Sequence, residues 1–170
     1  MAKWIVDPAH SEIGFKVKHL MINNVKGQFK SFASEVESSS DDFKDAKINF
    51  SADLSSIDTG NEQRDGHLKS ADFFNAEKHP QLIFTGKNFD GSTLEGDLSI
   101  AGITKPVKLN VDFGGVAKDP WGNTKAGFTV TGKINRKDWG INWNATLETG
   151  GFLVSDEVTI TAEVQYQKQA

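Results

Sequence analysis

Alternation of apolar and polar residues with a period of two is the feature that most restricts how this chain can fold. Successive side chains of a β-strand point to opposite faces of a sheet, so this alternation is typical of a strand with one face inward and one face in water. The clearest segments are residues 13–19, 48–54, 94–100, 107–113, 128–134 and 158–166. The chain is therefore predicted to be all-β.

Two further strands complete the pattern. One covers about residues 25–36, and its inward parity changes between Phe29 and Phe32, which predicts a β-bulge. The other is a short strand at residues 82–84. Asp90-Gly91 predicts a hairpin after it, and the run at residues 119–123 predicts a turn between two later strands.

Residues 58–76 depart from the strand pattern. Thr59 and Glu62 have the spacing of a capping box, Asn61 is an alternative N-cap, and a short helix is expected to run to about Ser70. One helix beside about eight mostly antiparallel strands favours a closed barrel, because closure removes exposed strand edges. We expect one domain over residues 1–170, with an interior that is either filled by side chains or holds one small ligand.

Composition excludes several classes of protein. The chain has no cysteine, so it forms no disulfide and has no thiolate zinc site or cysteine nucleophile. Its net charge is −4 with no basic lobe or tail, which argues against nucleic acid or an anionic membrane surface as the main partner. No apolar run reaches the ~20 residues of a transmembrane segment, and the N-terminus shows no apolar leader. We therefore expect a cytoplasmic protein, or a periplasmic one if a leader has been removed.

Asp7, His10 and Ser11 are the three residue types of a hydrolytic triad. Triad members normally come from distant segments, whereas these lie within five residues and flank Pro8. Hydrogen bonds within a turn are the simpler interpretation, and the sequence context of a nucleophile elbow is missing. We predict no catalytic residue in this chain and no hydrolase activity that depends on Ser11.

Arg64, Asp65 and His67 form a second polar group, on the expected helix. With His79 downstream, a metal site is one interpretation, but the histidines have no recognisable ligand spacing. The polar face of a helix and a polar cluster at a pocket mouth are the other interpretations. We predict no metal and no cofactor.

Phenylalanine is expected to supply the interior. Twelve Phe accompany a single Tyr, and Phe has no polar atom to keep at a wet edge. The same inward rows also contain small residues, namely Gly27, Ala52, Gly96 and Gly132. Large and small side chains in one row either interdigitate into a packed core or leave a channel, and the sequence does not choose between them.

Three further residues are expected near the ends of the barrel. His19 shares the parity of Phe15 and Val17, so it is either a core or rim residue or a hydrogen-bond partner for the head group of a ligand. Trp139 and Trp143 are expected to pack at the rim and shut one barrel end, with a surface aromatic cage as the alternative.

Ordered motifs along nearly the whole chain resemble the YceI-like family. They are residues 4–11, Phe15-x-Val17-x-His19, residues 59–61, Arg64-Asp65-x-His67-Leu68, residues 72–74, Pro80 with Phe84, Gly96-Asp97-Leu98 with Gly102-Ile103-Thr104, Arg136-x-Asp138 with Gly140-Ile141, and Val154-Ser155-Asp156-x-Val158. Asn75 stands where an acidic residue is common, and Trp139 where Phe is common. The resemblance implies a lipocalin-like antiparallel barrel around an elongated apolar tunnel that binds a long-chain amphiphile. Such ligands include a polyisoprenoid, an isoprenoid quinone or a fatty amide, and no catalytic residue carries over.

We therefore predict a non-enzymatic protein that transports, stores or sequesters a lipid. The residues expected to line the tunnel are Phe15, Val17, Phe29, Phe50, Phe84, Leu98, Leu109, Phe113 and Phe128, and those expected at its polar end are His19, Arg64, Asp65 and His67. Two alternatives stay open. One is an enzyme acting on an isoprenoid or lipid through Asp7 and His10 or through the Arg64 group, and the other is a stress-response barrel with a packed core and a protein partner. A homodimer also stays open.

Overall fold

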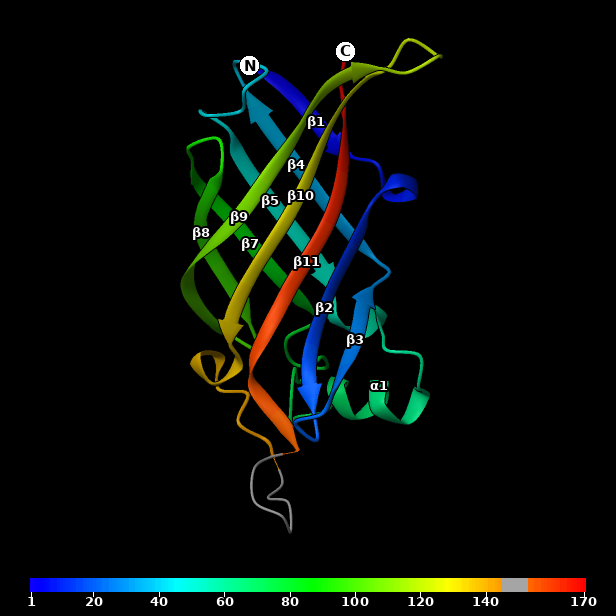
Figure 1. The fold of residues 1–170 in the computed structure, drawn as a ribbon, viewed down its shortest axis with the longest axis vertical. Helices are drawn as coiled ribbons and strands as arrows, with labels where there is room; N and C mark the ends of the chain where they lie inside the picture. Colours follow the sequence, from blue (N-terminus) through cyan, green and yellow to red (C-terminus); the bar gives the residue numbers. More distant parts are fainter. Residues whose placement is uncertain (145–152) are drawn as a thin grey trace.

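The alternating segments form a closed antiparallel barrel of eight strands with one α-helix, as predicted. We call each of the eight positions around the barrel a stave, because three of them are interrupted and consist of two shorter strands. The computed structural model describes residues 1–144 and 153–170. Five staves are single strands: β7 (Gln81–Phe89), β8 (Thr93–Ile100), β9 (Ile103–Lys118), β10 (Thr124–Asn135) and β11 (Val154–Lys168). Neighbouring staves are antiparallel and follow one another in the sequence, so the barrel is an up-and-down meander (Figure 1).

The other three staves are bent, and each consists of two strands. They are β1 (Ala2–Val6) with β2 (Glu12–His19), β3 (Asn23–Phe29) with β4 (Phe32–Ser38), and β5 (Lys47–Asp53) with β6 (Ile57–Asp58). β11 closes the barrel by pairing with β2 along its first part and with β1 at its end. The single strand expected over residues 25–36, with a β-bulge between Phe29 and Phe32, is instead two strands: β3 ends at Phe29 and β4 begins at Phe32 after a bend. The strand expected at residues 82–84 is longer than predicted, because β7 continues along β8 to Phe89.

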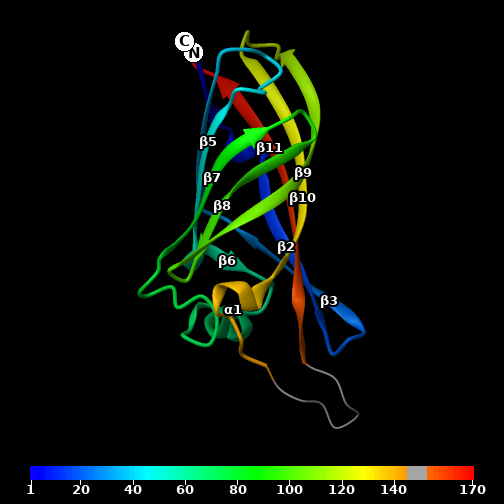
Figure 2. The ribbon, with the colours of Figure 1, turned by 90° about the vertical axis from the view of Figure 1, so that its left-hand side faces the viewer.

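The helical excursion lies where the sequence predicts it. Helix α1 (Glu62–Lys69) begins after Asn61, whose side-chain oxygen accepts a hydrogen bond from the Arg64 amide at 3.0 Å. Asn61 is therefore the N-cap, and Ser70 follows the last helical residue. Helix α1 lies at one end of the barrel, whereas both chain termini and the β9–β10 hairpin lie at the other (Figures 1 and 2). No helix among the described residues is long and apolar enough to cross a bilayer.

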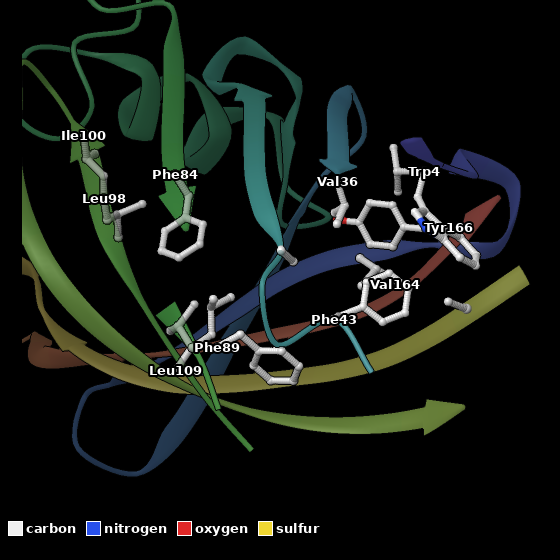
Figure 3. Close-up of a cluster of buried hydrophobic side chains, with 14 of the residues drawn as sticks. Trp4, Val36, Phe43, Phe84, Phe89, Leu98, Ile100, Leu109, Val164 and Tyr166 are labelled. Atoms are coloured by element: carbon white, nitrogen blue, oxygen red, sulfur yellow. The ribbon is translucent and has the colours of Figure 1, made fainter. Parts of the chain in front are cut away.

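The end of the barrel near the termini is tightly packed. Phe43 comes from the loop between β4 and β5 and is only 2 % exposed. Its ring meets those of Trp4, Phe113 and Phe128 edge-on, with centroids 5.1, 5.5 and 5.2 Å away. Figure 3 shows Phe43 beside Trp4 and Tyr166, apart from the second group around Phe84. These rings close one end of the barrel.

Candidate functional site

A cavity of about 560 Å³ occupies the barrel interior between the packed end and α1. This volume lies within the ~300–1,000 Å³ that is usual for ligand sites. Its wall is built from the inward rows of β2, β3, β5, β7, β8, β9, β10 and β11, together with residues of α1 and of the segments after α1 and after β10. Most of these side chains are aliphatic or aromatic, so the cavity suits an apolar ligand.

The inward residues of β2 and β11 show that this part of the barrel is not filled. Phe15, Val17 and Ile160 face the interior, yet all three are only half-buried. A side-chain-filled interior would bury them, as it does Phe84 and Leu98 on the opposite wall. Side chains therefore do not fill the whole interior, and the fully packed core that the sequence allowed is not what the structure has.

The inward glycines do not themselves make the channel. A methyl group at Gly27 would lie 2.4 Å from the ring of Phe15, and one at Gly96 would lie 2.6 Å from the ring of Phe84. Gly132 is covered in the same way by Leu109. The small residues accept neighbouring large side chains, so the two kinds interdigitate within the wall.

The deep end of the cavity contains one polar side chain, and it is fully satisfied. The hydroxyl groups of Tyr166 and Ser34 lie 2.7 Å apart, and Ser34 donates to the Asn49 carbonyl at 2.8 Å. Burial raises the pKa of Tyr166 to about 12, so its hydroxyl is neutral. No buried side-chain nitrogen or oxygen in the described part of the chain lacks a hydrogen-bond partner. The deep wall therefore presents no unpaired polar group to a ligand.

The opposite end of the cavity is polar and reaches solvent. Gln63 and Arg64 of α1 and the N-cap Asn61 border it and are exposed, as is Lys18 of β2. We call this end the mouth. Half-buried His19 borders it as well.

His67 at the mouth is held by an acid and two aromatic rings. Its Nε2 lies 2.9 Å from Asp72 Oδ2, and its ring meets Phe73 and Trp143 edge-on at 5.0 and 4.7 Å. Trp139 is 3 % exposed and donates its indole N–H to the Leu98 carbonyl at 2.8 Å. The two tryptophans therefore pack at the rim, as predicted, and do not form a surface cage. They do not shut this end of the barrel, because the cavity reaches solvent here.

Arg136 fastens the segment after β10 to the start of β11. It is 4 % exposed, and its guanidinium donates to the carbonyl groups of Ser155, Ile141 and Trp143 at 2.8–2.9 Å. Burial lowers its pKa, and Asp156 acts in the opposite direction. A buried arginine with carbonyl partners positions the wall of the mouth.

Most residues predicted for the site border this cavity. They are Phe15, Val17, His19, Phe29, Phe50, Arg64, His67, Phe84, Leu98 and Leu109. Contact of any of them with a ligand remains a prediction.

Three predicted residues do not border the cavity. Phe113 and Phe128 stack on each other with centroids 4.9 Å apart and support Phe43 at the packed end. Asp65 accepts hydrogen bonds from the amide and hydroxyl of Thr59, so it anchors the start of α1. The inward parity of the two phenylalanines is as expected, but parity does not tell how far along a barrel the open space extends.

Sequence reasoning missed several residues of the wall. Ile160, Val164 and Tyr166 border the cavity and lie in an alternating segment, and Leu82 borders it with the parity of Phe84, so parity was the available signal. Phe73 and Phe74 lie on neither a strand nor a helix, and periodicity gives no indication of their place.

The triad-like residues near the N-terminus form a turn outside the cavity wall. Asp7 accepts from the Ala9 amide, lies 2.9 Å from the His10 ring and accepts from Lys125 at 2.7 Å. The Lys125 ammonium is the main cause that lowers the pKa of Asp7 to about 2. Ser11 instead accepts from the Gln165 amide at 3.0 Å. Among the described residues, no group of three His, Asp or Glu side chains is arranged to hold a metal ion.

Comparisons with known proteins agree with this architecture. The family model of the YceI-like domain matches residues 4–166. A UPF0312 protein of Staphylococcus aureus is 42 % identical over 167 residues, which are 98 % of each chain. The crystal structure of a Campylobacter jejuni YceI protein is 35 % identical, covers 96 % of each chain and superposes with a TM-score of 0.75. A polyisoprenoid binding domain from Saccharophagus degradans shares the fold at 13 % identity, with a TM-score of 0.67 and 98 % of each chain covered.

Proposed function

The chain belongs to the YceI-like family, and we propose that it binds a long-chain amphiphilic lipid in the barrel cavity, for transport, storage or sequestration. Candidate ligands are a polyisoprenoid, an isoprenoid quinone or a fatty amide. The observation that carries the proposal is the apolar cavity of about 560 Å³, closed at one end by Phe43 and open to polar residues at the other. The Saccharophagus degradans neighbour is a polyisoprenoid binding domain, which supports the ligand class.

Burial of the hydrocarbon chain supplies the binding free energy. Each buried methylene contributes about 0.8 kcal/mol, so a chain inside an apolar wall needs no charged anchor. Ordering the chain opposes part of this gain. An apolar wall of preformed shape reduces that cost, because the protein side chains are already in place.

The polarity of the two ends gives the ligand a direction. A lipid head group buried at the Phe43 end would lose its water without a free polar partner, because the hydroxyl groups of Tyr166 and Ser34 already bond each other. At the mouth, His19 and Arg64 border the cavity, and the cavity reaches solvent. The proposal therefore places the tail toward Phe43 and the head group at the mouth.

The alternatives that stayed open from the sequence have less support. The Asp7–His10 pair lies outside the cavity wall, and Arg64 is engaged by the hydroxyl and carbonyl of Thr59 at 2.7 and 2.6 Å. A binding role without catalysis is therefore part of the proposal. A stress-response barrel with a fully packed core does not fit the open cavity.

Native mass spectrometry of the purified protein, followed by organic extraction, tests the proposal. We expect a bound lipid that is released by solvent, and a cargo-free protein that takes up a prenyl chain again. Phe50→Trp should lower the affinity at least severalfold while the fold persists, because Phe50 borders the cavity and a larger ring fills it.

Phe113→Trp is the matched control, because Phe113 lies in the packed end and not in the cavity wall. It should cost stability without a comparable loss of lipid affinity. Unchanged affinity in Phe50→Trp, with thermal unfolding intact, would contradict binding in this cavity.

A further inference from the structure

The tip of the β2–β3 hairpin exposes three apolar residues in a row. Leu20, Met21 and Ile22 are 39, 60 and 74 % exposed. Other large apolar residues exposed in the described part of the chain are separate from one another in the sequence. Scattered exposed side chains are normal on a protein surface, whereas three together at the end of a projecting hairpin indicate a contact surface.

The backbone at this tip has positive φ angles, which other residue types adopt more easily than Leu and Met do. Leu20 and Met21 have φ of +54° and +62°, and the Ile22 amide closes the turn on the His19 carbonyl at 3.2 Å. A turn with two central residues at positive φ favours Asn and Gly. Leu and Met there indicate that the side chains at the tip matter more than the ease of the turn.

Lysines surround the tip. Between Ile13 and Phe29 the charged residues are Lys16, Lys18 and Lys26. All three alternate with the inward row and are exposed, and none forms an ion pair with a described residue. Lys16 lies directly opposite Lys26 in the β2–β3 register. Like charges opposed in this way repel each other, so an anionic surface beside them would be stabilising.

The tip lies beside the mouth of the cavity. Val17 and His19 of β2 and Val25 of β3 border the cavity from the inner face of this same hairpin. In Figure 1 the hairpin turn and α1 lie at the same end of the barrel, away from the termini. At about 3.3 Å per strand residue, Lys16 lies roughly 13 Å behind Leu20. A surface that the tip contacts therefore lies close to the mouth of the cavity.

We propose that the β2–β3 tip docks the barrel on an anionic lipid bilayer, with Leu20, Met21 and Ile22 in the interfacial region and the three lysines facing the head groups. Short apolar segments flanked by Lys are suited to the boundary between acyl chains and head groups. The net charge of −4 of the whole chain would disfavour an anionic surface, so docking must be local to this hairpin. The orientation places the mouth where a lipid can pass between bilayer and cavity, and this consequence rests on the proposed function.

Vesicle flotation with the full-length protein tests the proposal. We expect recruitment to vesicles of mixed phosphatidylcholine and phosphatidylglycerol, whose surface is anionic, and weak recruitment to phosphatidylcholine alone. The variant Leu20→Asn/Met21→Gly should lose at least about tenfold in partitioning while its melting temperature stays the same or rises, since both new residues accept positive φ. Replacing Lys16, Lys18 and Lys26 by Gln should cause a loss of about the same order, and added salt should weaken binding of the parent protein.

Trp121→Ser is the matched control. Trp121 is 83 % exposed at the β9–β10 turn, at the end of the barrel away from the mouth, so its loss should leave recruitment unchanged. The proposal would be overturned if the hairpin variant were recruited as well as the parent protein, or if the parent bound neutral and anionic vesicles equally. It would also be overturned if no vesicle recruited the protein, and a protein partner would then be the alternative occupant of the tip. Native mass spectrometry of the same variants reports bound lipid separately. A protein that carries bound lipid but is not recruited to vesicles would overturn the docking surface alone. A protein that is recruited to vesicles but carries no bound lipid would count against the proposed function.

Discussion

Gly27 and Gly96 occupy similar inward positions but have different surroundings. A Cβ atom at Gly27 would lie 2.4 Å from the tip of the Phe15 ring, which has the cavity beside it. A Cβ atom at Gly96 would lie 2.4 Å from the Thr85 carbonyl oxygen as well as against Phe84. A ring can turn into open space, whereas a carbonyl of the β7–β8 ladder cannot move without disturbing the sheet.

We therefore expect the two alanine substitutions to have different effects. Gly27→Ala should push Phe15 into the cavity and lower lipid affinity severalfold, with a small loss of stability. Gly96→Ala should destabilise the fold by about 1–3 kcal/mol, the usual cost of overpacking. Urea unfolding and lipid titration of both variants measure the two effects. Similar stability losses without a difference in affinity would show that Phe15 does not move toward the cavity.

The sequence predicts that these glycines face inward, because alternation sets parity. It does not reveal what covers them, since that depends on the register between strands. Phe15 and Gly27 are directly opposite only because β2 and β3 pair in the observed register. Alternation therefore predicts which face of the sheet a glycine lies on, but it does not predict which side chain packs against that glycine.

Helix α1 is fastened mainly by polar contacts at its first turn. None of its residues is fully buried, and Leu68 provides its main apolar contact with the small cluster around Leu54. Asp65 accepts from the amide and hydroxyl of Thr59 at 2.9 and 2.6 Å, and Asn61 caps the first turn. A helix held this way at the cavity mouth can open locally without unfolding the barrel.

Asp65→Ala should loosen α1 selectively. We expect faster amide hydrogen exchange over residues 62–69 and faster lipid release, with a stability loss of only about 1 kcal/mol. Glu62→Ala is the matched control, because it removes an acid from the same first turn without a role in the Thr59 contact. Equal exchange in both variants would mean that the charge near the helix start, rather than the Thr59 anchor, holds α1.

The position of α1 could be predicted and its attachment could not. Thr59 and Asn61 were both plausible caps from spacing alone. In the structure Asn61 is the N-cap, whereas the Thr59 hydroxyl donates a hydrogen bond to Asp65. Two hydroxyl or amide side chains so close in sequence compete for the same amides, and only the path of the chain into the helix decides between them.

At the scale of the whole molecule, alternation predicts the eight staves but not which end of the barrel is closed. Phe43 follows the polar residues 38–42, in a loop outside every alternating row. It nevertheless fills the barrel end and is 2 % exposed. Long-range packing of a loop side chain leaves no periodic signal, so the closed end was the main feature of the site that sequence reasoning could not find.

This closed end should set the longest chain that the barrel accepts. A small void of about 60 Å³ touches Phe43 and shares Ile48, Leu94 and Tyr166 with the main cavity. Phe43→Gly should enlarge this void behind the shared residues and shift the preference toward longer prenyl chains. Its backbone has φ of +61°, which glycine adopts without strain. We expect a stability loss of about 3–5 kcal/mol, as for other truncations of buried Phe.

Competition among prenyl alcohols of graded length, read by native mass spectrometry, measures this preference. Phe43→Leu is the control. It keeps a large apolar side chain at the closed end, so it should leave the order of preference close to that of the parent protein. Circular dichroism must show that both variants retain the barrel. A folded Phe43→Gly variant that still prefers the parent's chain length would place the limit elsewhere. A tail that enters from the mouth reaches the end near Phe43 last, so enlarging that end should change length selection without changing recognition of the head group.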